Sequence, residues 1–130
     1  MVKHIPWLFY LTGFAVFLVD QVSKYAVKMS TFRYTTNTGA AFGLLQGQQW
    51  LLILIGLLVI GVLLYYSHEY QVALGFLLGG TLGNLVDRAL YGFVIDFIHL
   101  PFWPSFNVAD SFNVLGVALL LWDAAARRRQ

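Results

Sequence analysis

Residues 50–66 read WLLILIGLLVIGVLLYY and contain no charged side chain. A run this long and this apolar is typical of a helix that crosses a membrane, for which roughly 17–25 such residues are needed. The whole chain agrees with that interpretation, because 59% of its 130 residues are hydrophobic, 11% are charged and the mean hydropathy is +0.72. A soluble domain of this size needs more polar surface to cover its core, so the composition predicts an integral membrane protein.

Three further apolar segments accompany this one, at residues 5–27, 72–90 and 109–126. The first is not followed by a small-residue cleavage site, so we interpret it as a helix of the mature protein rather than a cleaved signal peptide. The fold class that follows is an all-α integral membrane protein with four transmembrane helices. We expect residues 1–130 to form a single membrane-embedded domain.

Two long connections, Met29 to Gln49 and Tyr91 to Val108, contain Gly, Asn and aromatic residues, and the second also contains proline. We expect both to be irregular or partly extended rather than helical. With four crossings the termini share one side of the membrane, and Lys3 together with the cluster Arg127 to Arg129 favours the cytoplasmic side. The basic residues that count against this orientation are Lys24, Lys28 and Arg33.

Composition also excludes several kinds of function. The chain has no cysteine, so it has no disulfide framework, no thiolate metal site and no cysteine nucleophile. Its formal net charge of +2 is too small to indicate nucleic-acid binding.

Ionisable residues at membrane depth are costly and mark candidate functional sites. Asp20 and Lys24 are four residues apart, of opposite sign, and on one face of the first helix. An interfacial ion pair, with Lys24 reaching toward the head groups, is the alternative to a functional role.

Two glycine-containing blocks follow. Asn37 to Gly43 has small residues that let its backbone approach another chain, although an ordinary turn explains it equally well. Gly79 to Arg88 places Asn84, Asp87 and Arg88 at the polar end of a helix stripe. Its alternative is a packing seam that ends in an Asp–Arg pair.

The last block contains Asp96 and Asp110, each in a mainly apolar stretch. The connection between them contains Pro101 and Pro104 and must bend, so the ends of the third and fourth helices can bring the two carboxylates face to face. Two carboxylates that share one proton are the working parts of an aspartic protease. For Asp110 alone, a helix N-cap is the alternative.

Taken together, these blocks resemble the lipoprotein signal peptidases, the signal peptidase II family, between Val19 and Ser111. The matching stretches are DQVSK at 20–24, NTGAAFG at 37–43, GGTLGNLVDR at 79–88 with VIDF at 94–97, and FNVADS at 106–111. They are similar to the family's D-Q-x-[ST]-K, N-x-G-A-A-F-G, G-G-x-x-G-N-x-x-D-R, V-x-D-F and F-N-x-A-D-S. One departure concerns the stretches before Asn37 and Asn107, which are shorter than is typical of the family. Met29 to Thr36 has room for one short strand of an extracytoplasmic β region.

The resemblance implies an aspartyl endopeptidase of the bacterial inner membrane, with Asp96 and Asp110 as the catalytic pair. It implies supporting roles for Asp20, Lys24, Asn37, Asn84, Asp87, Arg88 and Asn107. The implied substrates are diacylglyceryl-modified prolipoproteins, cut just before the lipidated cysteine near the extracytoplasmic face. It also implies that no metal or other cofactor is used and that globomycin-type inhibitors bind the site. We further expect contact with membrane lipids, and we expect neither nucleic acid nor an obligate protein partner. The alternatives are an inactive relative that binds lipidated peptides and a small membrane transport subunit.

Overall fold

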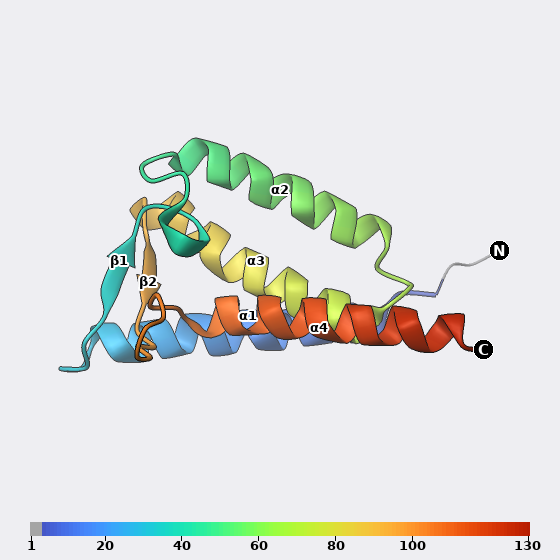
Figure 1. Cartoon of the computed structure of the whole chain (residues 1–130). Helices are drawn as coiled ribbons and strands as arrows, with labels where there is room; N and C mark the ends of the chain where they lie inside the picture. The colour runs from blue at the N-terminus through green and yellow to red at the C-terminus, as the bar shows by residue number, and fades with distance from the viewer. Residues whose placement is uncertain (1–3) are drawn as a thin grey trace.

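The computed structural model describes residues 4–130, and its four helices are held together at one end by a small sheet (Figure 1). The helices are α1 (Trp7–Lys28), α2 (Gln49–Tyr65), α3 (Gln71–Tyr91) and α4 (Val108–Arg128). Each lies within two residues of an apolar segment predicted from the sequence, so the expectation of four helices is confirmed. Lys3, which was used to orient the termini, lies outside the described residues.

Helix α3 lies between α1 and α4 and carries more buried positions than any of the other three helices. Its glycines allow this close packing. A Cβ atom at Gly79 would lie 2.5 Å from the carbonyl oxygen of Gly13 in α1, and one at Gly80 would lie 2.6 Å from that of Ala109 in α4. Small residues at these two positions let the three backbones approach each other, as in other membrane helix bundles.

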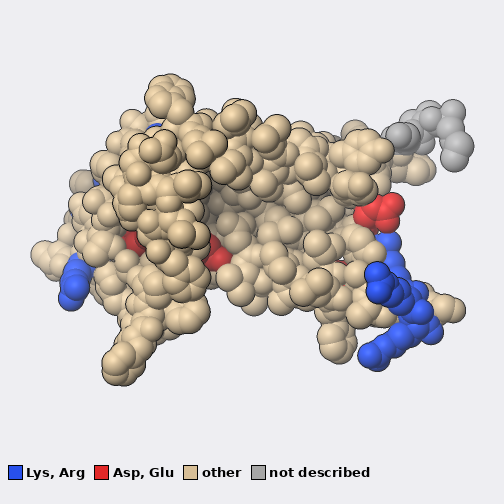
Figure 2. Space-filling view, turned by 45° about the horizontal axis from the view of Figure 1, so that its top comes forward, with Lys and Arg blue, Asp and Glu red and all other residues tan. Residues whose placement is uncertain are grey.

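The outer faces of the helices carry many large apolar side chains, such as Leu11 (66% exposed) in α1 and Leu121 (66% exposed) in α4. Figure 2 shows that, on the face in view, the basic side chains lie toward the two ends of the molecule and most of the surface between them is uncharged. By length and composition alone, α4 is the one helix in residues 4–130 long and apolar enough to cross a membrane, and α2 is apolar but shorter. Length and composition alone therefore do not establish four crossings.

The two long connections meet in an antiparallel pair of strands, β1 (Thr35–Asn37) and β2 (Val94–Asp96). Thr35 lies opposite Asp96 in this register. The predicted short strand is therefore present at the end of the Met29 to Thr36 stretch, and it extends one residue beyond it to Asn37. The first connection also contains a single 3-10 turn, η1 (Ala41–Gly43), in which Phe42 has a φ of 57°, so this connection is irregular and partly extended as expected.

The opposite end of the bundle is fastened by Arg127. Its guanidinium donates to Glu69 Oε2 over 3.1 Å and lies over the ring of Tyr70 at 4.0 Å from the ring centroid. Both contacts join the end of α4 to the turn between α2 and α3. One member of the basic cluster therefore has a structural partner. Helix α1 begins and α4 ends at this end, far from the sheet (Figure 1).

Candidate active site

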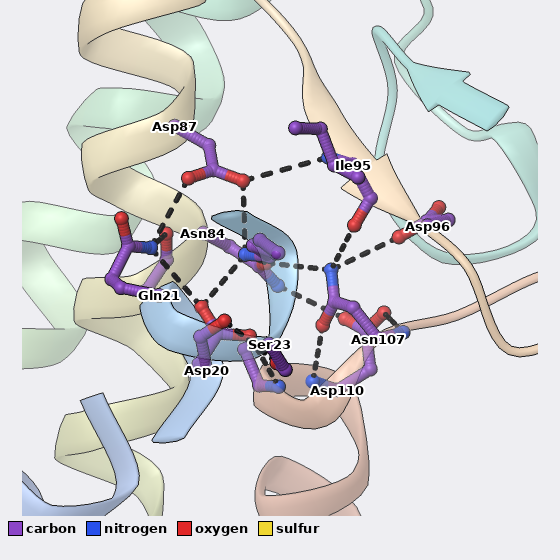
Figure 3. Close-up of polar contacts among 12 residues, drawn as sticks. Asp20, Gln21, Ser23, Asn84, Asp87, Ile95, Asp96, Asn107 and Asp110 are labelled. Carbon is purple, nitrogen blue, oxygen red and sulfur yellow. Dashed lines mark hydrogen bonds and ion pairs between the residues drawn. The ribbon is translucent and has the colours of Figure 1, made fainter. Parts of the chain in front are cut away.

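Polar side chains from α1, α3, β2 and α4 converge beside the sheet (Figure 3). They come from positions up to 89 residues apart, as in the 2.8 Å hydrogen bond from the Ala109 N–H to Asp20 Oδ1. The structure brings together the following predicted residues: Asp20, Lys24, Asn84, Asp87, Asp96, Asn107 and Asp110.

Asp110 lies in the first turn of α4, and its backbone is fixed by a capping box. The N–H of Asp110 donates to Asn107 Oδ1 over 2.9 Å, and the N–H of Asn107 donates to Asp110 Oδ2 over 3.1 Å. The N-cap residue is thus Asn107, and the alternative that Asp110 itself is the N-cap is wrong. This arrangement fixes the carboxylate of Asp110 at the start of the helix.

Asp96 is the last residue of β2 and is only 2% exposed. The Asn107 Nδ2 lies 3.0 Å from Asp96 Oδ1 and 3.0 Å from Asn84 Oδ1. Asn84 in turn donates from Nδ2 to Asp110 Oδ1 over 2.9 Å. Two amide side chains therefore connect the two carboxylates and fix their orientation.

Burial, together with the nearby carboxylate of Asp110, raises the pKa of Asp96 to about 7. The hydrogen bond from Asn107 is among the contacts that partly oppose this rise in pKa. Near neutral pH, Asp96 therefore exists in both its neutral and its ionised form. A pair of this kind can hold one proton between two carboxyl groups.

A buried ion network lies next to this pair (Figure 3). Lys24 Nζ lies 2.7 Å from Asp20 Oδ2 and 2.9 Å from Asp87 Oδ2. Lys24 is 3% exposed, so the alternative in which it reaches toward lipid head groups is wrong. The alternative Asp–Arg pair is also not formed, because Asp87 pairs with Lys24 of α1 rather than with its neighbour Arg88.

Gln21 belongs to the same network, although it was not among the predicted site residues. Its Nε2 lies 3.2 Å from Asp20 Oδ2, 3.2 Å from Asp87 Oδ1 and 3.1 Å from the carbonyl oxygen of Gly83. The signal that could have found it is its place in the DQVSK stretch, directly after Asp20.

Arg88 and Asn37 line the same cavity as the pair and contact the loop around η1. Arg88 Nη2 donates to the carbonyl oxygen of Gly39 over 3.2 Å, while Asn37 Oδ1 accepts from the Gly39 N–H over 2.8 Å. Arg88 thus ties α3 to this loop. The buried Arg88 Nε has no hydrogen-bond partner among residues 4–130 and remains a donor near the carboxylates.

A cavity of about 960 Å³ is lined by Asp96, Asp110 and Arg88. From the carboxylates it extends along α2 and α4, where its wall is mainly apolar and includes Leu52, Ile55, Val59, Val114 and Leu115. The site therefore combines a polar end, able to perform acid–base chemistry, with an apolar channel able to receive an acyl chain or an apolar peptide.

Comparison with known proteins agrees with this geometry. Residues 12–126 match the family model described as signal peptidase (SPase) II. A lipoprotein signal peptidase of Syntrophomonas wolfei is 50% identical over 94 residues, which cover 68% of this chain and 63% of that relative. The lipoprotein signal peptidase of Halothermothrix orenii is 38% identical, with 86% of this chain and 91% of the relative covered. That of Bacillus subtilis is 36% identical, with 95% and 99% covered.

Two solved structures are also similar. A bacterial membrane enzyme determined by the in meso method at 2.3 Å resolution has a TM-score of 0.83 and 30% identity, with 89% of this chain and 86% of that chain covered. A second, at 1.9 Å resolution, has a TM-score of 0.79 and 30% identity, with 88% and 90% covered.

Proposed function

The chain belongs to the signal peptidase II family, and from that premise we propose that Asp96 and Asp110 are the catalytic pair with which it removes signal peptides from prolipoproteins. The observation that carries this proposal is that both carboxylates line one cavity and are connected through Asn84 and Asn107. The reaction is the hydrolysis of one peptide bond.

In this proposal the two carboxyl groups have complementary roles. Asp110 accepts hydrogen bonds from two N–H donors, which suits a carboxylate that takes a proton from the attacking water. Asp96, with its pKa raised to about 7, carries the proton that it donates toward the oxygen of the scissile carbonyl. Water then adds to the carbonyl carbon, the C–N bond breaks, and the leaving amine receives a proton from the pair.

The remaining polar residues position this pair. Asp20 connects α1 to the start of α4 through the Ala109 N–H, one residue before Asp110. Lys24 connects Asp20 to Asp87, and Asn84 and Asn107 contact the carboxylates themselves. Further supporting roles belong to Asn37 and Arg88, which hold the loop at the mouth of the cavity.

Four membrane crossings, with residues 1–130 as one membrane-embedded domain, are part of this proposal. The support is the exposed apolar surface of the helices, since water-soluble proteins rarely expose contiguous apolar patches this extensive. The helices have 17–22 residues, within the range of about 17–25 residues found for transmembrane helices. In this arrangement the membrane is the bacterial inner membrane, the termini are cytoplasmic and the active site lies near the extracytoplasmic face.

The substrate in this proposal is a prolipoprotein that carries a diacylglyceryl group on the cysteine directly after the scissile bond. The apolar channel between α2 and α4 provides the environment that acyl chains and the signal peptide require. Globomycin-type inhibitors would occupy the same cavity. Neither an inactive relative nor a transport subunit is favoured by any contact in the site, because both carboxylates of the pair are present and oriented.

A cleavage assay tests the proposal. The purified full chain in detergent micelles is given a lipidated lipobox peptide, with and without globomycin, and the released signal peptide is quantified. We expect cleavage just before the lipidated cysteine and its loss with the inhibitor. Absence of cleavage by folded protein would show that the assigned reaction is wrong.

A further inference from the structure

The wall of the cavity is not uniformly apolar below the carboxylate pair. One helical turn after Asp110, α4 places Asn113 on the cavity, and one turn before Asn84, α3 places Thr81 there. A helix rises about 1.5 Å per residue, so both side chains lie roughly 4.5 Å farther from the sheet than the residues of the site. The opposite wall, formed by α2, is apolar at this depth.

No hydrogen bond within residues 4–130 accounts for the polar side chain of Asn113 at this position. Its Oδ1 is buried and makes no hydrogen bond within residues 4–130. This atom lies so close to Gly80 that a methyl group there would overlap it. Because the amide can be turned about its last torsion, either its oxygen or its nitrogen can face the cavity while the other faces Gly80. An unsatisfied amide at membrane depth is unfavourable and suggests a missing ligand.

The chemistry of the reaction supplies a ligand for it. The substrate segment around the scissile peptide bond must be extended for that bond to lie between two carboxyl groups. The residues of this segment therefore lose the internal hydrogen bonds of a helix. Water is scarce at this depth, and each unpaired main-chain group there is costly. The part of the substrate that descends from the pair into the bilayer is the apolar signal peptide, since the mature part leads outward.

We propose that Asn113, with Thr81 beside it, hydrogen-bonds the main chain of the unwound signal-peptide segment just before the scissile bond. This inference rests on the proposed function and names a substrate-binding subsite within the same cavity. It makes the two side chains specific for an extended peptide rather than for a helix. A helical segment would have no free main-chain donor or acceptor to offer them.

The first test is to measure kcat/KM for the full chain with a lipidated lipobox peptide. Asn113→Leu keeps a similar side-chain volume and should lower kcat/KM by about tenfold to a hundredfold, as expected for a hydrogen bond lost in an apolar site. Asn113→Ser should recover part of that loss, and Thr81→Val should give a smaller one. Val117→Leu in the same helix, which does not line the cavity, is the matched control and should match the wild type.

The second test identifies which part of the substrate is bound. Replacing one amide at a time by an ester, over the residues before the scissile bond, removes an N–H and weakens a carbonyl acceptor. At the contacted position, the ester substrate should give the wild type a lower kcat/KM than the amide substrate does. For Asn113→Leu, which already lacks the contact, the ester should lower kcat/KM little further. A substrate whose acyl esters are replaced by ethers should leave the effect of Asn113→Leu unchanged. If the ether substrate abolishes that effect, the amide binds the lipid and the proposal is wrong.

The outcomes separate the two proposals. One outcome is that the wild type cleaves the peptide while folded Asn113→Leu and Thr81→Val variants have the same kcat/KM as the wild type. That result overturns the subsite and leaves the protease assignment standing. Folded wild-type protein that cleaves no lipidated peptide overturns both. If Asn113→Leu does not fold, Asn113→Ser and Thr81→Val with the amide-to-ester substrates carry the same test.

Discussion

Removing the single cation of the buried network should destabilise the protein strongly. Lys24 is 3% exposed and lies within 2.9 Å of carboxylate oxygens of Asp20 and Asp87, which are 0% and 2% exposed. In Lys24→Met the apolar stem is kept, but two negative charges remain buried without their cation. Breaking a buried ion pair from one side costs about 3–5 kcal/mol. That is a large share of the roughly 5–15 kcal/mol by which a protein of ordinary stability is folded.

The free energy of unfolding can be measured by titrating SDS into mixed micelles and following tryptophan fluorescence. Lys28→Met is the matched control, because Lys28 follows one helical turn later, is exposed and only covers the ring of Tyr91. It should cost less than about 1 kcal/mol. Adding Asp87→Asn to Lys24→Met removes one of the two stranded charges and should recover part of the lost stability. A Lys24→Met protein within about 1 kcal/mol of the wild type would refute the argument that this charge balance holds α1 against α3.

Four further predictions concern catalysis and topology. Asp96→Asn and Asp110→Asn should each lower cleavage of the lipidated peptide by at least about a hundredfold while the protein still folds, because an amide cannot exchange a proton; a near wild-type rate in either would contradict the aspartyl mechanism. The pKa of Asp96 is raised to about 7, so Asp96 is neutral below that pH and kcat/KM should fall as the pH rises through about 7. In acid kcat/KM should fall again, because both carboxyl groups are then protonated. A pH-independent kcat/KM would contradict the shared proton. Arg88→Lys should lower the rate by about tenfold, since a point charge does not replace the planar guanidinium that holds the η1 loop, and full activity would exclude this positioning role. Cysteine labels at Thr36 and Gln130 should react from opposite faces of sealed vesicles, and labelling from one face would overturn the proposed orientation.

The sequence determined the elements and the class of the protein because these depend on local patterns. Long apolar runs specify helices wherever the backbone must satisfy its own hydrogen bonds, so the helix limits could be predicted to within two residues. The polar blocks were recognisable for a related reason, since ionisable residues are rare in apolar segments. The resemblance of these blocks to signal peptidase II identified the family before any contact was known, and the family comparison confirmed it.

The partners of those residues were decided only by the tertiary structure. Lys24 and Asn84 are 60 residues apart and meet because glycines let α1 approach α3. Sequence adjacency suggested Arg88 as the partner of Asp87, but consecutive helical residues point about 100° apart, and Lys24 of another helix fills the space that Asp87 faces. The N-cap role of Asn107 and the unpaired amide of Asn113 likewise depend on how α4 meets its neighbours. A one-dimensional pattern specifies which residues form a helix, whereas the side chains that meet between helices depend on the distance and rotation at which the helices pack.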